Sequence, residues 1–345
     1  CALSFPAAAK VDAAEAAKLG KELTPTGGEV AANKDGTVSA WEGGLTNPPA
    51  CYKGAGTRYC DPFPEDKPEY TVNKANLDKY KSKLTSGQIT LFEKFGDTYK
   101  MNVYKTRRSL ANPKAIYDAT AKNAVNATLG GNGEALTGAI TGIPFPIPKT
   151  GMEVIWNHKV RYRNLTALRW NNQFAVTTSG DYNQTKLREE IKFSYSKDGI
   201  TPESLNNVMF YFMQITTAPP RLAGTILLVH ETMDQVKEAR RAWQYNPGQR
   251  RLRRAPNVGY DNPGTGADGL RTNDQTDTYN GAMDRYEWKL VGKKDMLMPS
   301  GNSYLLHSDK YKYKDIVKKG HLNQDLPRYE MRRVWVVEAN LKKGT

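Results

Sequence analysis

Residues 206–217, NNVMFYFMQITT, carry large apolar side chains at both odd and even positions. Successive side chains of a β-strand point to opposite faces of the sheet, so this stretch has two apolar faces. One face is predicted to hold Met209, Tyr211, Met213 and Ile215, and the other Val208, Phe210 and Phe212. We therefore expect either that protein covers both faces, or that one face lines an apolar cavity.

Further β-type runs follow the Pro-rich stretch GIPFPIPKTG at residues 142–151. Besides residues 206–217, strands are predicted at residues 172–178, 182–196, 224–231, 239–254, 285–291 and 328–341. Ser179-Gly180-Asp181 is typical of a hairpin turn, and Asn246-Pro247-Gly248 divides the run at 239–254. This spacing indicates an antiparallel meander. The run at 328–341 has no later partner, so we expect the sheet to continue in strands beyond residue 345.

Helical periodicity dominates the region before the strands. Residues 73–129 contain three helical stretches, with Ser86 and Asn112 as predicted caps and Pro113 in the first turn of the third. Residues 150–163, TGMEVIWNHKVRYR, fit both a helix and a strand. Glu153 near the start and Arg161 near the end suit the helix dipole, so a helix is predicted.

The N-terminal region lacks a core of its own. Residues 1–9, CALSFPAAA, are typical of the end of a secretory signal, although Cys1 could instead be the lipidated first residue of a lipoprotein. Residues 10–72 are rich in turn-forming residues and are expected to wrap over the rest of the chain. Cys51 and Cys60 are predicted to form a disulfide, because the chain is expected in an oxidising compartment and no His lies near them to complete a metal site.

The composition describes a folded, basic protein without a recognisable catalytic motif. The chain has 345 residues and a formal charge of +14, which favours polyanions such as anionic lipid headgroups or nucleic acid. No nucleic-acid-binding motif is present, so nucleic acid is not an expected partner. The four His residues lie in four separate segments, which argues against an enzyme, although a triad assembled in space stays open.

Two acidic segments were weighed as metal sites. Residues 31–42 follow an EF-hand spacing, but Ala31 stands where the first ligand is needed, so a Gly turn is favoured there. Residues 261–284 are expected to form a solvated loop or a lid rather than a metal site. Neither a metal nor a cofactor is predicted. Basic residues cluster at 240–254 and 310–319, where some should meet acids or lipid headgroups.

Several motifs in order resemble one known family. They include LTPTGGEVAANKDGTVSAWEGG (residues 23–44), DPFPEDKP (61–68), TGIPFPIPKTGMEVIWNH (141–158), AWQYNPGQRRLRRAP (242–256), DRYEWKLVGKK (284–294) and RYEMRRVWVVEANLKKGT (328–345). The chain is identified as similar to exported Gram-negative proteins of uncharacterised function. Members are often labelled outer-membrane lipoprotein-sorting proteins and are related in fold to the Lol lipoprotein carriers.

The resemblance implies an α+β fold with a strongly curved antiparallel sheet. This half-barrel would span residues 141–345 and take acyl chains on its concave side, with helices, including the segment at 73–140, as a lid. The predicted cavity residues are the large apolar side chains of the strands and of the preceding helix: Trp156, Phe193, Tyr195, Met209, Tyr211, Met213, Trp243, Tyr245, Tyr286, Trp288 and Trp335.

The sequence therefore predicts a periplasmic, non-enzymatic carrier or chaperone for a lipid, a lipoprotein acyl chain or another hydrophobic ligand, which could associate with the outer membrane. The alternative is an adaptor subunit of an envelope export complex, with a solid core and a partner surface. A deep apolar groove would favour the carrier, and a filled concave side would favour the adaptor.

Overall fold

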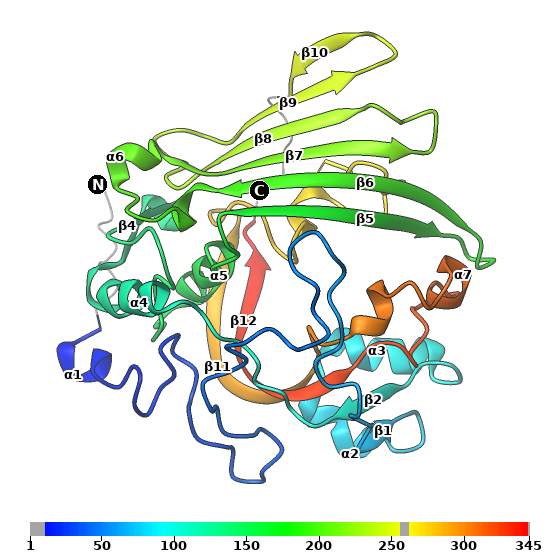
Figure 1. The fold of residues 1–345 in the computed structure, drawn as a ribbon, viewed down its shortest axis with the longest axis horizontal. Helices are drawn as coiled ribbons and strands as arrows, with labels where there is room; N and C mark the ends of the chain where they lie inside the picture. Colours follow the sequence, from blue (N-terminus) through cyan, green and yellow to red (C-terminus); the bar gives the residue numbers. More distant parts are fainter. Residues whose placement is uncertain (1–10, 256–261, 344–345) are drawn as a thin grey trace.

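A computed structural model describes residues 11–255 and 262–343 of the chain. The described chain is of the α+β class, as predicted, with three antiparallel or mixed sheets and short helices (Figure 1). The predicted signal remnant at residues 1–9 lies outside the described residues. Residues 17–69 contain no helix or strand in the structure, in keeping with an extended segment.

The largest sheet has six antiparallel strands in the order β10-β9-β8-β7-β6-β5 (Figure 1). Its strands are β5 (Thr166–Val176), β6 (Tyr182–Phe193), β7 (Val208–Ala218), β8 (Ile226–Thr232), β9 (Arg241–Asn246) and β10 (Arg251–Arg254). Each strand pairs with its neighbour in the chain, so this part is the predicted meander. Two hairpin turns also fall where they were predicted, between β5 and β6 and between β9 and β10.

The remaining strands form a second sheet rather than continuing the first. Its order is β1-β2-β12-β11, with β1 (Tyr70–Val72), β2 (Met101–Tyr104), β11 (Tyr286–Pro299) and β12 (Tyr329–Leu341). Figure 1 shows β11 and β12 as a long curved ribbon below the six-stranded sheet. A short hairpin, β3 (Thr128–Gly130) and β4 (Ala135–Thr137), makes the third sheet.

The last strand is not simply an edge strand. β12 pairs with β11 along its whole length and is also joined in parallel to β2 at Tyr329 and Glu330. Among the described strands, the rest of that side of β12 has no strand partner. The predicted unpaired edge is therefore found only along the later part of β12. The first residues of β12 lie between β2 and β11, inside the sheet.

The helices are short and lie mostly before the six-stranded sheet in the chain. The α-helices are α1 (Ala13–Ala16), α2 (Leu77–Tyr80), α3 (Ser86–Phe95), α4 (Lys114–Asn126), α5 (Gly151–Lys159), α6 (Pro202–Leu205) and α7 (Tyr313–Ile316). The 3₁₀ helices are η1 (Lys81–Lys83), η2 (Gly131–Gly133), η3 (Ser194–Ser196), η4 (Asn273–Gln275) and η5 (Tyr304–His307).

Two predicted caps were wrong by one position. Thr85, not Ser86, caps α3: its side chain accepts from the Gln88 amide while the Gln88 side chain accepts from the Thr85 amide. The residue that caps α4 is Pro113, with no side-chain cap, so Asn112 does not cap it. Residues 150–163 do begin with a helix, α5, whose capping box joins Thr150 and Glu153.

Helix α5 packs under the six-stranded sheet and fills the main core. Trp156 is fully buried, and its Nε1 donates to the Gly133 carbonyl at 2.7 Å. Around it lie Tyr195, Phe193, Met209 and Met283, all at most 2% exposed. A second core lies where α3 packs on β1, β2 and the adjoining ends of β11 and β12. The space that a half-barrel could offer is therefore largely occupied by the protein's own side chains.

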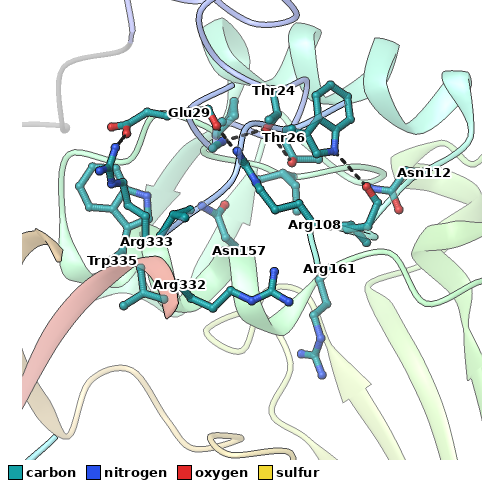
Figure 2. Close-up of a pocket in the computed structure, with 18 of the residues that line it drawn as sticks. Thr24, Thr26, Glu29, Arg108, Asn112, Asn157, Arg161, Arg332, Arg333 and Trp335 are labelled. Atoms are coloured by element: carbon teal, nitrogen blue, oxygen red, sulfur yellow. Dashed lines mark hydrogen bonds and ion pairs between the residues drawn. The ribbon is translucent and has the colours of Figure 1, made fainter. Parts of the chain in front are cut away.

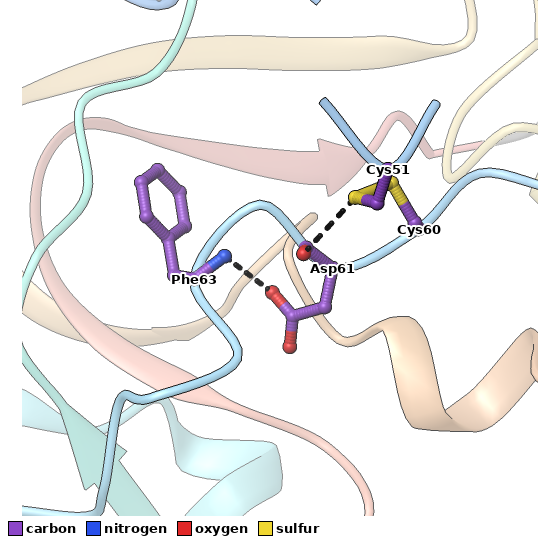
Figure 3. The surroundings of a disulfide bond; sticks show 4 residues. All are labelled: Cys51, Cys60, Asp61 and Phe63. Carbon is purple, nitrogen blue, oxygen red and sulfur yellow. Dashed lines mark hydrogen bonds between the residues drawn. A yellow bond between two sulfur atoms is a disulfide. The ribbon is translucent and has the colours of Figure 1, made fainter. Parts of the chain in front are cut away.

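The predicted disulfide is present. Cys51 and Cys60 are bonded at 2.03 Å and close a loop in the N-terminal segment (Figure 3). Directly after it, the Asp61 side chain accepts a hydrogen bond from the Phe63 amide at 2.9 Å. The Phe63 ring lies against the Arg107 guanidinium, 4.4 Å from the ring centroid. The disulfide loop is thus attached to the body of the protein through Phe63.

The packing of α5 predicts a sharp difference between two tryptophans. Trp156→Ala removes a fully buried ring and a hydrogen bond, so we expect the free energy of unfolding to fall by about 3–5 kcal/mol. Trp170→Ala is the matched control, because that ring is 66% exposed on β5, and a change within about 0.5 kcal/mol is expected. Urea unfolding followed by circular dichroism measures both. Equal losses would contradict the assignment of Trp156 to the core.

Candidate ligand-binding site

A sizeable cavity lies beside β12 rather than under the six-stranded sheet. It has a volume of about 580 Å³, within the range of about 300–1,000 Å³ that is usual for small-molecule sites. Its walls come from the N-terminal segment at 24–41, the connection at 106–117, α5 with the residues after it, and β12 (Figure 2). We call it the β12 pocket.

The β12 pocket exists because strand pairing stops early on one side of β12. After Glu330, the chain beside β12 is the connection at 106–110, which is held by side chains instead of a strand ladder. Thr106 Oγ1 donates to the Met331 carbonyl at 2.7 Å, and the Arg332 guanidinium donates to the Arg107 carbonyl at 2.9 Å. The connection therefore stands off from the strand and leaves room between them.

Positive charge dominates the lining. Its cationic residues are Arg108, Arg161, Lys293, Arg332 and Arg333, against the single carboxylate of Glu29. Glu29 is engaged by Arg333 and by Lys293, the latter at 3.2 Å. Figure 2 shows Arg161 pointing away from the other labelled side chains, and it pairs with Asp277 at 2.7 Å. Arg108, Lys293, Arg332 and Arg333 are the cations that remain in the pocket, and two of them pair with Glu29.

Arg108 is held differently from its neighbours. Its guanidinium donates to the backbone carbonyls of Glu29, Val30 and Ser39 at 2.7–3.3 Å. No carboxylate pairs with it among the described residues. Burial, together with the nearby Arg332 guanidinium, lowers the pKa of Arg108. A bound anion would supply the compensating charge that backbone dipoles give only in part.

Apolar surface completes the β12 pocket. Trp41 and Trp335 line it, together with Ile143, Val154 and Val334. The Lys293 ammonium lies 4.8 Å from the centroid of the Trp335 ring, and burial lowers the pKa of this lysine. Cationic groups beside aromatic and aliphatic walls fit a ligand with an anionic group and an apolar part.

A buried ion network fixes the connection at 106–110 against β12. Asp66 accepts from Arg107 at 2.6 Å and from Arg328 at 2.7 Å. Glu330, fully buried, pairs with Arg332 and accepts from the Arg107 amide at 2.9 Å. The network links β12 to the N-terminal segment through Asp66, so the walls of the β12 pocket are held by charge pairs that are mostly out of solvent.

The inner face of the six-stranded sheet offers much less space. Its cavity has a volume of about 90 Å³, the volume of roughly three water molecules in the liquid. Phe193, Met209 and Phe212 line it together with the cationic side chains of Lys159 and Arg240. Side chains from residues 273–280 also line it. A long acyl chain does not fit in this volume.

A β-bulge explains why Met209 reaches this inner cavity. The pairing of β7 with β8 shifts between Val208 and Phe210, so Met209 is the extra residue of the bulge. Met209 therefore packs with Phe210 and Phe212, and the prediction that it shares a face with Tyr211 was wrong. Strict alternation placed it on the opposite side because alternation takes no account of a bulge.

The predicted cavity residues are distributed over four places. Trp156 and Tyr195 are buried in the main core, and Phe193 and Met209 line the small inner cavity. Trp288 packs against the same core and donates from Nε1 to the Met283 carbonyl at 2.7 Å, and Tyr286 lies beside it. Trp335 lines the β12 pocket. The register carries the other four to the opposite face of the six-stranded sheet: Tyr211, Met213, Trp243 and Tyr245.

The charged residues of the β12 pocket were not singled out from the sequence. Arg107 and Arg108 form one pair and Arg332 and Arg333 another, but the two pairs lie 225 residues apart in the chain. Adjacent arginines on a strand are usually divided between its two faces and give no signal of a common site. The paired arginines were the only sequence signal, and their convergence depends on tertiary structure.

The other chemical candidates do not form a site in the described part of the chain. Residues 33–38 make a turn in which the Asn33 side chain accepts from the Val38 amide at 2.8 Å, and Gly36 has a φ of +70°. No group of three metal-ligating side chains is found among the described residues. His158 Nε2 lies 2.7 Å from the backbone carbonyl oxygen of Asp277, and His321 Nε2 lies 2.9 Å from Thr98 Oγ1.

Residues 262–284 contact the six-stranded sheet. Residues 262–284 lie against its inner face: Gln173 and Thr185 donate to the carbonyls of Thr265 and Gly266, and Met283 is fully buried. The segment is therefore packed on the sheet at these points, while other parts of it, such as Leu270, are exposed to solvent. Asp261 itself lies outside the described residues.

This is an α+β protein with one large antiparallel sheet and a cationic, aromatic pocket beside a second sheet. Residues 71–345 match the model of the family described as "Protein of unknown function (DUF1329)". An uncharacterized protein of Pseudomonas aeruginosa is 50% identical over 336 residues, covering 97% of this chain and 73% of that protein. The chain belongs to the DUF1329 family, which confirms the resemblance drawn from its motifs.

Two solved structures are similar over about half of the chain. One is a DUF1329 family protein from Desulfovibrio piger, with a TM-score of 0.34 and 15% identity over 56% of this chain and 74% of that one. The other is described as a "putative outer membrane lipoprotein-sorting protein domain" from Vibrio parahaemolyticus, with a TM-score of 0.32 and 13% identity over 57% of this chain and 74% of that one. Within the described ranges, no helix is both long and apolar enough to cross a bilayer.

The ion network makes a prediction about acid stability. The hydrogen bond from Arg107, helped by that from Arg328, lowers the pKa of Asp66 from 3.8 to about 2, although burial opposes the shift. A depressed folded-state pKa stabilises the fold above the unfolded-state value, and this stability is lost as the pH falls through the folded-state value. We expect Asp66 to contribute about 2 kcal/mol near neutral pH, most of it lost by pH 2.

Asp66→Asn should lower the free energy of unfolding at neutral pH and flatten its dependence on pH between 5 and 2. Urea unfolding at a series of pH values measures this. Asp118→Asn is the control, because Asp118 pairs with Lys114 on the exposed surface of α4 and should matter little. An acid limb unchanged in Asp66→Asn would contradict the proposed role of the network.

Proposed function

We propose that this protein is a non-enzymatic carrier that binds an amphiphilic anion in the β12 pocket. The observation that supports this is the combination of a cavity of about 580 Å³, four cations that point into it against one carboxylate, and walls that include Trp41 and Trp335. A fatty acid or a lysophospholipid has the matching chemistry, with an acidic group for Arg108 and Arg332 and a chain for the apolar walls. The carrier predicted from the sequence is retained, at a different place in the fold.

The electrostatic part of this proposal depends mainly on Arg108. Arg332 and Arg333 already have carboxylate partners, in Glu330 and in Glu29 and Asp295. Among the residues that the structure describes, Arg108 has only backbone carbonyls as partners, so an anionic group gains most by binding beside it. Hydrogen bonds to a charged group contribute about 1.5–3 kcal/mol, which corresponds to an affinity change of roughly tenfold or more.

A carrier fits the pocket better than an enzyme does. The pocket lining holds no His, Cys or Asp, and its one carboxylate, Glu29, is engaged by Arg333 and Lys293 within the described residues. A general base must be free to accept a proton from a bound reactant. A periplasmic location, expected from the first nine residues, is part of the same proposal and would suit transport of a lipid-like acid between membranes.

The proposal is tested with a fluorescent fatty acid and the fatty alcohol of the same length. The wild-type protein should bind the acid at least about tenfold more tightly than the alcohol. Arg108→Met should remove most of this preference while keeping binding of the alcohol, because the apolar walls are unchanged. Using the ratio of two affinities separates loss of the charge from partial loss of folding.

Arg221→Met is the matched control, since Arg221 is exposed in the turn after β7 and lies outside the pocket lining. It should keep the wild-type preference for the acid. Equal binding of acid and alcohol by the wild-type protein would overturn the proposed ligand chemistry. Failure to bind either probe would overturn the carrier itself.

A further inference from the structure

The register of the six-stranded sheet places a second set of apolar side chains on the face turned away from the core. Residues paired directly across antiparallel strands lie on the same face. One row across all six strands consists of Trp170, Arg188, Ile215, Ile226, Tyr245 and Leu252. The row beside it consists of Leu168, Glu190, Met213, Leu228, Trp243 and Arg254. We call the surface formed by these rows the outer face.

Exposure separates the outer face from the inner one. On the inner face Leu187, Ile191, Val229 and Ala242 are all buried. Every residue of the two outer rows is at least partly exposed, and Trp170, Leu252 and Leu168 are 66%, 68% and 47% exposed. The outer rows therefore form a surface in the described structure and not a second core.

The outer face is apolar to a degree that an ordinary solvated sheet face is not. Nine of its twelve row positions carry apolar or aromatic side chains, counted from the two rows. In the next row the His230 ring packs edge-on between Tyr211 and Trp243, with centroid distances of 4.7 Å to each. Contiguous exposed apolar surface usually marks a site of interaction with a membrane or another protein.

The charges on this face select between those partners. The two rows hold Arg188 and Arg254, and the next row adds Lys192 and Arg241, giving four cations against the one carboxylate of Glu190. Arg188 pairs with Glu190, and Arg241 pairs with Glu238 in the segment before β9. The β9–β10 hairpin, which projects at one edge of the sheet in Figure 1, carries the exposed Arg250 at its turn. Two such faces would repel each other, which disfavours a second copy of the chain as the partner.

We propose that the outer face docks on the surface of an anionic lipid bilayer. Tryptophan and tyrosine rings favour the membrane interface, where the ring is in an apolar layer and its polar atom reaches water. Basic side chains beside them add attraction to anionic headgroups, about fivefold in affinity for each charge near the surface. Trp170 and Leu252 stand at opposite edges of the sheet, so both edges can contact one surface.

Sedimentation with lipid vesicles tests this proposal. The wild-type protein should bind vesicles of phosphatidylcholine mixed with phosphatidylglycerol and bind pure phosphatidylcholine vesicles at least about fivefold less. Leu252→Ser combined with Trp170→Ser should lower binding to the anionic vesicles. Leu270→Ser is the matched control, because Leu270 is as exposed, at 69%, but lies off the sheet.

A charge reversal tests the electrostatic contribution to membrane docking separately from the apolar one. Arg254→Glu should weaken binding to the anionic vesicles at least about fivefold, whereas Lys122→Glu on α4 should change it much less. Absence of wild-type binding to anionic vesicles would overturn the proposal and assign the outer face to a protein partner. Equal losses in the test and control variants would also overturn it, because binding would then follow net charge or general hydrophobicity.

Failure of the membrane-docking proposal can be distinguished from failure of the carrier proposal. Arg108 lies in the connection beside β12, whereas the outer face belongs to the six-stranded sheet, so Arg108→Met should leave vesicle binding unchanged. The outer-face variants should in turn keep the preference for fatty acid over fatty alcohol. Loss of vesicle binding in Arg108→Met would contradict the assignment of docking to the outer face.

Discussion

The packing of Trp156 from α5 against the inner face of the six-stranded sheet determines where in this protein a ligand can bind. That contact, with Tyr195, Phe193 and Met283 around it, converts the hollow of the sheet into a core. Protein interiors are packed to nearly crystalline density, so a filled core of this kind leaves only isolated small spaces. The 90 Å³ cavity under the sheet is what remains. Ligand space therefore has to be found elsewhere in the fold.

The second sheet supplies that space through an interrupted pairing. β2 joins β12 at only two residues, and the connection that follows is fastened by the side chains of Thr106, Glu330 and Arg332. A continued strand ladder would have brought the backbone close to β12 and closed the gap. Hydrogen bonds from side chains hold it at a greater distance, and one of the donors, Arg332, also lines the β12 pocket. The interruption of the pairing and the positive charge of the pocket therefore share Arg332.

The two faces of the six-stranded sheet have different functions in the proposed arrangement. The inner face stabilises the fold, and the outer face presents apolar and cationic side chains to the surroundings. A protein with a ligand pocket on one sheet and a membrane-docking surface on the other could collect an amphiphile at a bilayer without unfolding its core. The sequence alternative of an adaptor subunit required a solid core and a partner surface, and the filled inner face agrees with the first of these conditions.

The sequence by itself determined the local features of this chain. Strand periodicity located the meander from β5 to β10, the charges of Glu153 and Arg161 at the two ends favoured α5 as a helix, and Cys51 and Cys60 formed the expected disulfide. Only the tertiary structure decided which apolar face is buried, because a one-residue bulge at Met209 and the position of α5 are invisible to alternation. It also brought Arg108 beside Arg332, since contacts between residues so distant in the chain depend on how the sheets pack and not on spacing.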